Sequence, residues 1–160
     1  LWLKGENFEG DRGLAAELGA VPFIYDGQVL VYEDVCGINA MLGDCGYKRD
    51  DAASLESFIA SYESGGEKEL AAVDKSARGV ALLVRCLVGI TGCRDVIIGG
   101  KISRFGEDYL NRVREYLREE KIFDIGMLEI RYGKHLNDGT VVGAIDKAVS
   151  CVIDAAVAER

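Results

Sequence analysis

The stretch from Asp95 to Ser103 limits the possible folds more than any other part of this chain. A β-branched run, Val96–Ile98, leads directly into Gly99 and Gly100 and then into a helical pattern. Such an uninterrupted apolar run is typical of a strand covered on both faces in an α/β sheet. Glycine allows positive φ and close approach of the backbone to a ligand, and open α/β sheets bind ligands beyond the carboxyl ends of their strands. We therefore expect any small-molecule contact of this chain to lie near the glycine pair, although the segment is neither GxGxxG nor a P-loop.

Length and charge narrow the class of protein. With 160 residues, 49% of them hydrophobic, the chain has the size of one domain or of one lobe of a larger domain. A net charge of −8 argues against direct binding of nucleic acid, which needs clustered Lys and Arg. No apolar run approaches the roughly 18 residues of a membrane span, and no signal peptide opens the chain. We expect a cytoplasmic protein with no membrane partner, and the first residue, Leu1, suggests a piece of a longer protein.

The cysteines predict neither a disulfide framework nor a zinc site. They form no CxxC pair, their number is odd, and His135 is the only histidine. A structural zinc site needs four Cys or His ligands, usually in close pairs. Such a composition favours a reducing compartment. The five cysteines are Cys36, Cys45, Cys86, Cys93 and Cys151.

Hydrophobic periodicity predicts an α/β unit with strands early and a helix–strand–helix–strand–helix ending. Asp26–Gly27 predicts a hairpin turn between two apolar runs. The last helix has an expected apolar face of Val142, Ile145, Val149, Val152 and Ala156 and a capping pair at Asn137–Asp138. The expected strands are 20–25, 28–32, 95–98 and 128–132, and the expected helices are 33–42, 52–62, 68–90, 104–120 and 139–158.

Three segments in chain order resemble the ROK family (repressors, open reading frames and sugar kinases). They are Gly13–Gly19, Val96–Gly100 and Asn137–Ala144, and their order and spacing fit essentially the whole chain. The resemblance implies an actin-like ATPase (ribonuclease H-like) fold, in which two α/β lobes hold a sugar and a nucleotide between them. Residues 1–160 would form a single unit, most of the C-terminal lobe. The phosphate-binding Asp-Gly-Thr turn and the catalytic aspartate would precede Leu1, so this segment has no kinase activity of its own.

The resemblance also implies site residues, each with a plainer alternative. Glu17 would accept hydrogen bonds from two adjacent sugar hydroxyls; otherwise it is an exposed turn carboxylate. Gly99, Gly100 and Gly143 would form the nucleotide edge. The alternatives, which we favour, are a tight strand-to-helix turn for the pair and close helix packing for Gly143. Lys101 would crowd an adenine slot.

Several positions depart from the family pattern. Ala20 replaces a histidine that contacts sugar and zinc, and Gly43 replaces a second sugar-contacting glutamate. In the segment that replaces the zinc knot, Asp34 and Met41 stand where thiolates are expected and only Cys36 remains as a ligand. We therefore expect no zinc and no other cofactor, and the departures argue against ATP binding.

These departures favour a regulator over an enzyme, because chemistry tolerates few missing contacts whereas a sensor tolerates many. The resemblance then implies the effector-binding and oligomerisation part of a ROK transcriptional regulator that senses a sugar or sugar phosphate, self-associates, and meets DNA only through an upstream domain. One alternative is the C-terminal lobe of an ATP-dependent ROK sugar kinase of the hexokinase or glucokinase type. Another is a dimerisation lobe without a ligand.

No catalytic residue is predicted in the chain. His135 is expected to be a loop histidine without a catalytic partner, and Cys36 has no neighbouring base that would activate it.

Overall fold

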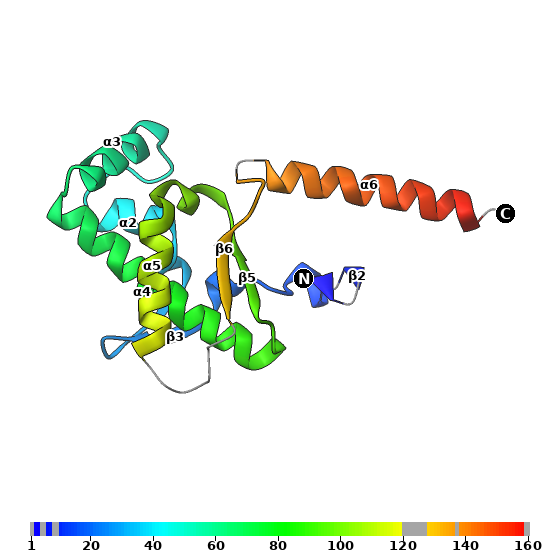
Figure 1. Cartoon of the computed structure of the whole chain (residues 1–160), viewed down its shortest axis with the longest axis horizontal. Coiled ribbons are helices and arrows are strands. Elements are labelled where there is room, and N and C mark those ends of the chain that lie inside the picture. The colour runs from blue at the N-terminus through cyan, green and yellow to red at the C-terminus, as the bar shows by residue number, and fades with distance from the viewer. Residues whose placement is uncertain (1, 4–5, 8–9, 120–127, 137, 159–160) are drawn as a thin grey trace.

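The computed structural model describes residues 2–3, 6–7, 10–119, 128–136 and 138–158. It is an α/β structure in which α4 and α5 lie side by side against the β5–β6 pair, and α6 leads away from the body (Figure 1). The described strands are β1 (Trp2–Leu3), β2 (Glu6–Asn7), β3 (Pro22–Tyr25), β4 (Gln28–Val31), β5 (Asp95–Ile98) and β6 (Glu129–Tyr132). The described helices are α1 (Glu33–Cys36), α2 (Ile38–Asp44), α3 (Ala52–Glu63), α4 (Glu67–Thr91), α5 (Gly106–Glu119) and α6 (Gly139–Ala158). Short 3-10 turns are η1 (Asp11–Gly13), η2 (Leu18–Ala20) and η3 (Gly100–Phe105).

The described strands form three two-stranded sheets. β1–β2 and β3–β4 are antiparallel, whereas β5–β6 is parallel. The hairpin predicted at Asp26–Gly27 is confirmed, and both residues have positive φ (49° and 79°), as a type I′ turn requires. The guanidinium of Arg78 lies 5.3 Å from the centre of the Tyr25 ring and 3.6 Å from the Asp26 carboxylate, which ties the hairpin to α4.

The predicted order of the elements is confirmed, and most helix ends have a local cause. Asp51 accepts a hydrogen bond from the backbone N–H of Ser54 (2.8 Å) at the start of α3, and Gly92 ends α4 in the left-handed conformation. The single helix predicted over 33–42 is instead two helices, because Gly37 has an extended backbone between α1 and α2. The helix predicted from Arg104 begins at Gly106 after η3, and its predicted end, Glu120, lies outside the described residues.

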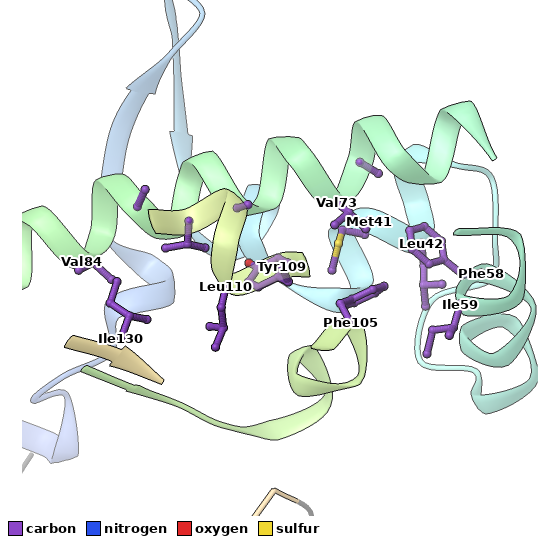
Figure 2. Packing of buried hydrophobic residues seen from close by; sticks show 14 of the residues in the cluster. Met41, Leu42, Phe58, Ile59, Val73, Val84, Phe105, Tyr109, Leu110 and Ile130 are labelled. Carbon is purple, nitrogen blue, oxygen red and sulfur yellow. The ribbon is translucent and has the colours of Figure 1, made fainter. Parts of the chain in front are cut away.

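A hydrophobic core fills the space between the helices and one face of the β5–β6 pair (Figure 2). Long helices α4 and α5 supply its centre, because each places small or branched residues toward the other at helical spacing. Helices α2 and α3 close one end, and Val96 and Ile98 of β5 pack against it from the sheet. The fully buried members include Met41, Phe58, Val73, Ala77, Tyr109, Leu110 and Val113.

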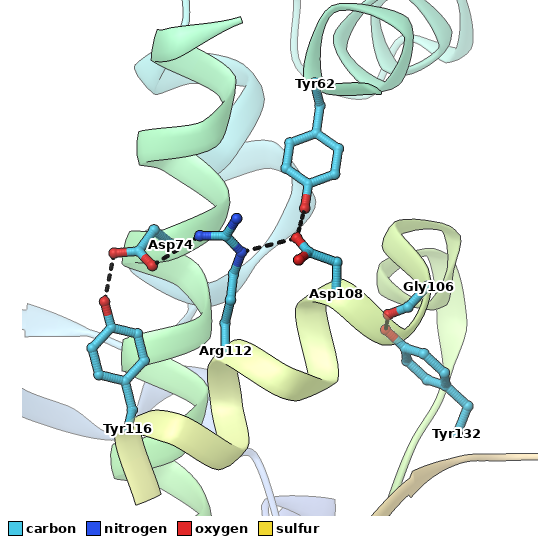
Figure 3. A network of polar contacts seen from close by, with 7 residues as sticks. All are labelled: Tyr62, Asp74, Gly106, Asp108, Arg112, Tyr116 and Tyr132. Atoms are coloured by element: carbon cyan, nitrogen blue, oxygen red, sulfur yellow. Dashed lines mark hydrogen bonds and ion pairs between the residues drawn. The ribbon is translucent and has the colours of Figure 1, made fainter. Parts of the chain in front are cut away.

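A polar network connects three helices beside this core (Figure 3). Arg112 of α5 contacts the carboxylates of Asp108 (3.0 Å) and Asp74 (3.3 Å). Tyr62 of α3 donates to Asp108, and Tyr116 donates to Asp74 of α4 (2.5 Å). The network therefore fixes α3 and α4 against α5.

The β5–β6 pair is covered on one face only, which corrects the prediction of a strand buried on both faces. Val96 and Ile98 pack against the core, but Ile97 is 55% exposed. Arg131, the register partner of Ile97, also lies on the open side and pairs with the Asp95 carboxylate at 3.0 Å. The apolar run predicted the strand correctly, but among the described residues the covering layer comes from α4 and α5 alone.

Helix α6 follows the predicted range, yet the described part of its apolar face has no cover. Val142, Ile145, Val149 and Val152 are all exposed. Asn137, the first residue of the predicted cap, lies outside the described residues, and the carbonyl of Asp138 accepts the N–H of Val142 (2.9 Å). α6 is therefore a helix that contributes little to the core of this chain.

All five cysteines are free thiols. Within the described ranges, none of the helices combines the length and hydropathy needed to cross a membrane.

Candidate functional site

Glu17 lies on an exposed turn immediately before η2. Its carbonyl accepts the backbone N–H of Ala20 at 3.2 Å, and its own N–H donates to the carbonyl of Leu14 at 3.4 Å. The turn rests on α1, because a Cβ added at Gly19 would lie 3.4 Å from the Cβ of Glu33. Glu17 is thus an accessible acceptor on a backbone that is held at both ends.

Segment 34–43, which the family resemblance aligns with a zinc knot, does not gather a set of metal ligands. Asp34 is exposed, Cys36 points toward Gly79 of α4, and Met41 is buried in the hydrophobic core. Burial raises the pKa of the Cys36 thiol to about 12, so it is protonated at neutral pH and is a poor ligand and nucleophile. In the part of the chain that the structure describes, His, Cys, Asp and Glu side chains form no group of three that would hold a metal ion. The residues present do not fit a tetrahedral zinc site.

At Gly43 the structure places a cation where the family resemblance leads one to expect a sugar-binding carboxylate. The guanidinium of Arg49 lies over this glycine: a Cβ added there would be 2.6 Å from Nε and 2.7 Å from one terminal nitrogen. Nearby, the side chain of Asn39 donates to the Asp50 carboxylate at 2.6 Å and accepts the Asp50 backbone N–H at 2.9 Å, which fixes the loop carrying Arg49. The charge at this point is therefore the reverse of the expected one.

The glycine pair after β5 forms an open, exposed turn. Gly99 is extended, whereas Gly100 has a φ of 76°, a conformation that favours glycine. Ser103 closes the turn by donating to the carbonyl of Gly100 at 2.8 Å. A Cβ at either glycine would meet no atom within 4 Å, and Lys101 is exposed. The tight turn accounts for the presence of both glycines. Because neither has a side chain, the backbone here leaves room for a ligand.

Gly143 and His135 are both exposed. The predicted role of Gly143 is close helix packing, but among the described residues a Cβ there would have no neighbour within 4 Å. His135 is an exposed loop residue, yet its Nδ1 lies 3.3 Å from a carboxylate oxygen of Asp138. The sequence pattern gives no indication of this carboxylate partner.

The predicted site residues lie on three separate elements: Glu17 before η2, the glycine pair after β5, and Gly143 on α6. Two residues beside the site were missed. Glu33 contacts the Glu17 turn through Gly19, and Arg49 covers Gly43. Arg49 gave no signal in the sequence, because a single exposed arginine in a loop has no periodicity or motif.

Comparison with known proteins bears on this arrangement. No family model matches the chain. The N-acetylmannosamine kinase of Salmonella typhi is 30% identical over 150 residues, which cover 88% of this chain and 49% of that protein. The crystal structure of a ROK hexokinase from Thermus thermophilus superposes with a TM-score of 0.65 at 21% identity, over 84% of this chain and 48% of that one.

The chain thus spans about half the length of the relatives that it matches. Its fold is that of part of a ROK hexokinase, as the resemblance implied. By sequence and by fold its homologues are ROK-family sugar kinases, which supports placing this chain in the ROK family.

Proposed function

We propose that this chain is the C-terminal half of a sugar-sensing ROK protein that acts as a homo-oligomer, with Glu17 as the sugar contact. One observation carries the proposal. Glu17 is present on an exposed, backbone-fixed turn, whereas Ala20 and the Gly43–Arg49 contact replace the other two polar sugar contacts of the family pattern. A site with one of three contacts is suited to reversible sensing rather than to phosphoryl transfer.

The chemistry at Glu17 fits this role. An ionised carboxylate accepts from two neighbouring hydroxyls, and each such charge-assisted bond is stronger than a neutral one. Exposure means that sugar hydroxyls exchange for water at little desolvation cost. Arg49, if it reaches the same ligand, would favour a sugar phosphate or another acidic sugar, because a guanidinium binds phosphate and carboxylate.

Sensing requires only a difference in affinity between two states. If the sugar binds one lobe arrangement better than another, it shifts their populations by that difference. In a regulator this shift would alter the spacing of DNA-reading segments outside the chain. Neither zinc nor ATP takes part in the proposed mechanism.

The second candidate is the C-terminal lobe of an ATP-dependent sugar kinase, and the similarity to N-acetylmannosamine kinase over 88% of the chain favours it. In that case the open backbone at Gly99 and Gly100 would hold the nucleotide. The residues that transfer the phosphoryl group would come from outside this chain.

Isothermal titration calorimetry tests the proposal. Monosaccharides and sugar phosphates, including N-acetylmannosamine, are titrated into the full-length protein that the gene encodes. We expect saturable binding without ATP, and a loss of affinity of about 10- to 100-fold in Glu17→Gln, since a hydrogen bond to a charged group contributes about 1.5–3 kcal/mol. Glu115→Gln is the matched control, because Glu115 is an exposed carboxylate on α5. Its affinity should equal that of the wild type.

A parallel assay for sugar-dependent release of ADP separates the two candidates. Binding without ADP release supports the sensor. ADP release that Glu17→Gln abolishes would identify the kinase lobe and contradict the sensor. Absence of binding to every sugar would reject both.

A further inference from the structure

Aromatic and charged contacts attach the β3–β4 hairpin to α1 and α4. The ring of Phe23 is stacked on the ring of Tyr32, with 4.1 Å between their centres and 2° between their planes. Tyr32 immediately precedes α1 and is only 3% exposed. At the tip of the hairpin, the guanidinium of Arg78 contacts the Tyr25 ring and the Asp26 carboxylate. A two-stranded hairpin is only marginally stable alone, so these contacts fix its position.

The same cluster reaches the turn that carries Glu17. The backbone N–H of Tyr32 donates to the carbonyl of Val21 at 3.3 Å, and the N–H of Val21 donates to the carbonyl of Leu18 at 3.2 Å. Leu18 follows Glu17 directly and begins η2. Tyr32 therefore connects the hairpin, the start of α1 and the Glu17 turn.

The family resemblance would give this connection to a metal. A histidine at the position of Ala20 and thiolates in segment 34–43 would hold zinc between them, and the ion would tie the Glu17 turn to that segment. In this chain Ala20 has no ligand atom in its side chain. Burial raises the pKa of the Cys36 thiol, which is therefore protonated at neutral pH. Within the described ranges, the side chains that remain do not complete a tetrahedral site.

We infer that Phe23, Tyr32 and Arg78 are positioning residues whose contacts hold the Glu17 turn in place without a metal. The ring stack and the hydrogen bond from Tyr32 to Val21 join the same two parts of the chain that zinc would join in the resembled pattern. The position of the turn then depends on aromatic rings and is independent of the zinc supply. This inference goes beyond the proposed function, and it does not depend on whether Glu17 binds a sugar.

Metal analysis of the full-length protein that the gene encodes is the first test. The protein is purified without a chelator from zinc-supplemented medium, and bound zinc is measured by inductively coupled plasma mass spectrometry. We expect well below one zinc ion per chain and the same melting temperature with and without EDTA, because a structural zinc site contributes folding energy that a chelator removes. One zinc ion per chain that Cys36→Ala removes would overturn the inference.

Hydrogen exchange tests the positioning role. In Phe23→Ala, which removes the stack, we expect the amides of Ala20, Val21 and Tyr32 to exchange at least about tenfold faster, because local opening no longer breaks an aromatic contact. Phe23→Tyr keeps a ring that can stack and should retain the wild-type protection. Val29→Ala is the matched control, since Val29 lies on the opposite face of the same hairpin and is 74% exposed. It should leave these amides unchanged.

Arg78 gives an independent variant pair. Arg78→Met keeps most of the length of the side chain but removes its charge, and it should accelerate exchange in β3 and β4. Arg78→Lys keeps a cation that can lie over the Tyr25 ring, so it should retain part of the protection. Equal exchange in the two variants would show that the charge over the ring does not hold the hairpin.

The amides of α5 show whether an effect is local. Helix α5 lies in the hydrophobic core, to which Phe23 does not belong, so its exchange rates should match the wild type in every variant. Equal acceleration in α5 would indicate a global loss of stability and would overturn the positioning role. Equal effects of Phe23→Ala and Val29→Ala would also overturn it, as would faster exchange of the Glu17 turn after EDTA treatment of the wild type.

Discussion

Gly79 allows α4 to lie directly against the sulfur of Cys36. A Cβ added at Gly79 would be 2.6 Å from Sγ of Cys36 and 3.1 Å from Cγ1 of Val35. Val35 is almost fully buried, so it has no room to withdraw. The glycine therefore sets the distance between α1 and α4, and with it the position of the turn that carries Glu17.

Gly79→Ala should destabilise the protein by about 1–3 kcal/mol, because overpacking a tight contact forces side chains or backbone to move. Urea unfolding followed by circular dichroism measures the change. Gly43→Ala is the matched control, since its close neighbour is the end of the long, exposed Arg49 side chain, which can turn into solvent. That change should be neutral, or stabilising by up to about 1 kcal/mol through helix propensity. Adding Cys36→Ala to Gly79→Ala should recover part of the loss, and the absence of recovery would contradict the contact.

Ser76 of α4 connects α1 and α5 inside the core. Its hydroxyl donates to the carbonyl of Cys36 at 2.9 Å and lies 3.0 Å from the hydroxyl of Tyr109. Ser76→Ala should cost about 1–3 kcal/mol, because it leaves two buried polar groups without this partner, whereas Tyr109→Phe should cost about 0.5–1.5 kcal/mol. Thermal or urea unfolding compares the two, and a larger cost for Tyr109→Phe would show that Ser76 is not the central member.

Three tyrosines predict loss of stability at alkaline pH. Burial raises the pKa of Tyr62, Tyr116 and Tyr132 to about 12 from the usual value of 10.0, and hydrogen bonds to Asp108 and Asp74 add to the effect for the first two. A pKa that is higher in the folded state than in the unfolded state stabilises the fold while the tyrosine is protonated. This stabilisation is complete below pH 10 and is lost as the pH rises toward 12. Tyrosinate absorbance and circular dichroism, recorded together, should change in this window. Ionisation of these three tyrosines near pH 10 with the fold intact would contradict the prediction.

Asp108 predicts a smaller loss of folding stability at acid pH. The hydrogen bond from Tyr62, and then the bond from Arg112, hold the pKa of its carboxyl below the usual value of 3.8. A lowered folded pKa gives stabilisation that is present above pH 3.8 and is lost as the pH falls through the folded value. The carboxylate is 58% exposed, so solvent screens the effect. Urea midpoints from pH 6 to 3 should fall less steeply in Asp108→Asn than in the wild type. Asp146→Asn, in an exposed helix, should keep the wild-type slope.

Sequence patterns predicted the elements well where the cause is local. Asp26–Gly27 specifies its hairpin turn through positive φ, and long helical spacing specified α3, α4 and α6. Prediction failed where the cause lies elsewhere in the chain. The apolar run of β5 implied two covered faces, but a sequence pattern does not say which layers are present to cover them. Gly37 interrupts the predicted helix because its backbone is extended between α1 and α2, and a side chain there would lie 3.0 Å from the carbonyl of Glu33.

The candidate site was predictable only in part. Motif order located Glu17, Gly99 and Gly100, and the structure shows their exposure. The position of Arg49 over Gly43 and the Tyr62–Asp108–Arg112 network depend on tertiary packing, since the last brings together residues 46 positions apart. No neighbour packs against Gly143 among the described residues, because packing of a glycine depends on a partner that the sequence does not identify.

Helix α4 has a consequence for how this protein folds. It contacts α1, α2, α3 and α5, so these four helices of the core are assembled on it. Its partner α5 follows after one short strand, β5, and the 3-10 turn η3, which keeps the entropy cost of closing that connection small. We expect the folding nucleus to form between α4 and α5, with high φ-values at Val73, Ala77 and Val113 and low ones at the β3–β4 hairpin. The Glu17 turn would then take its final position late, once α1 has docked on a preformed α4.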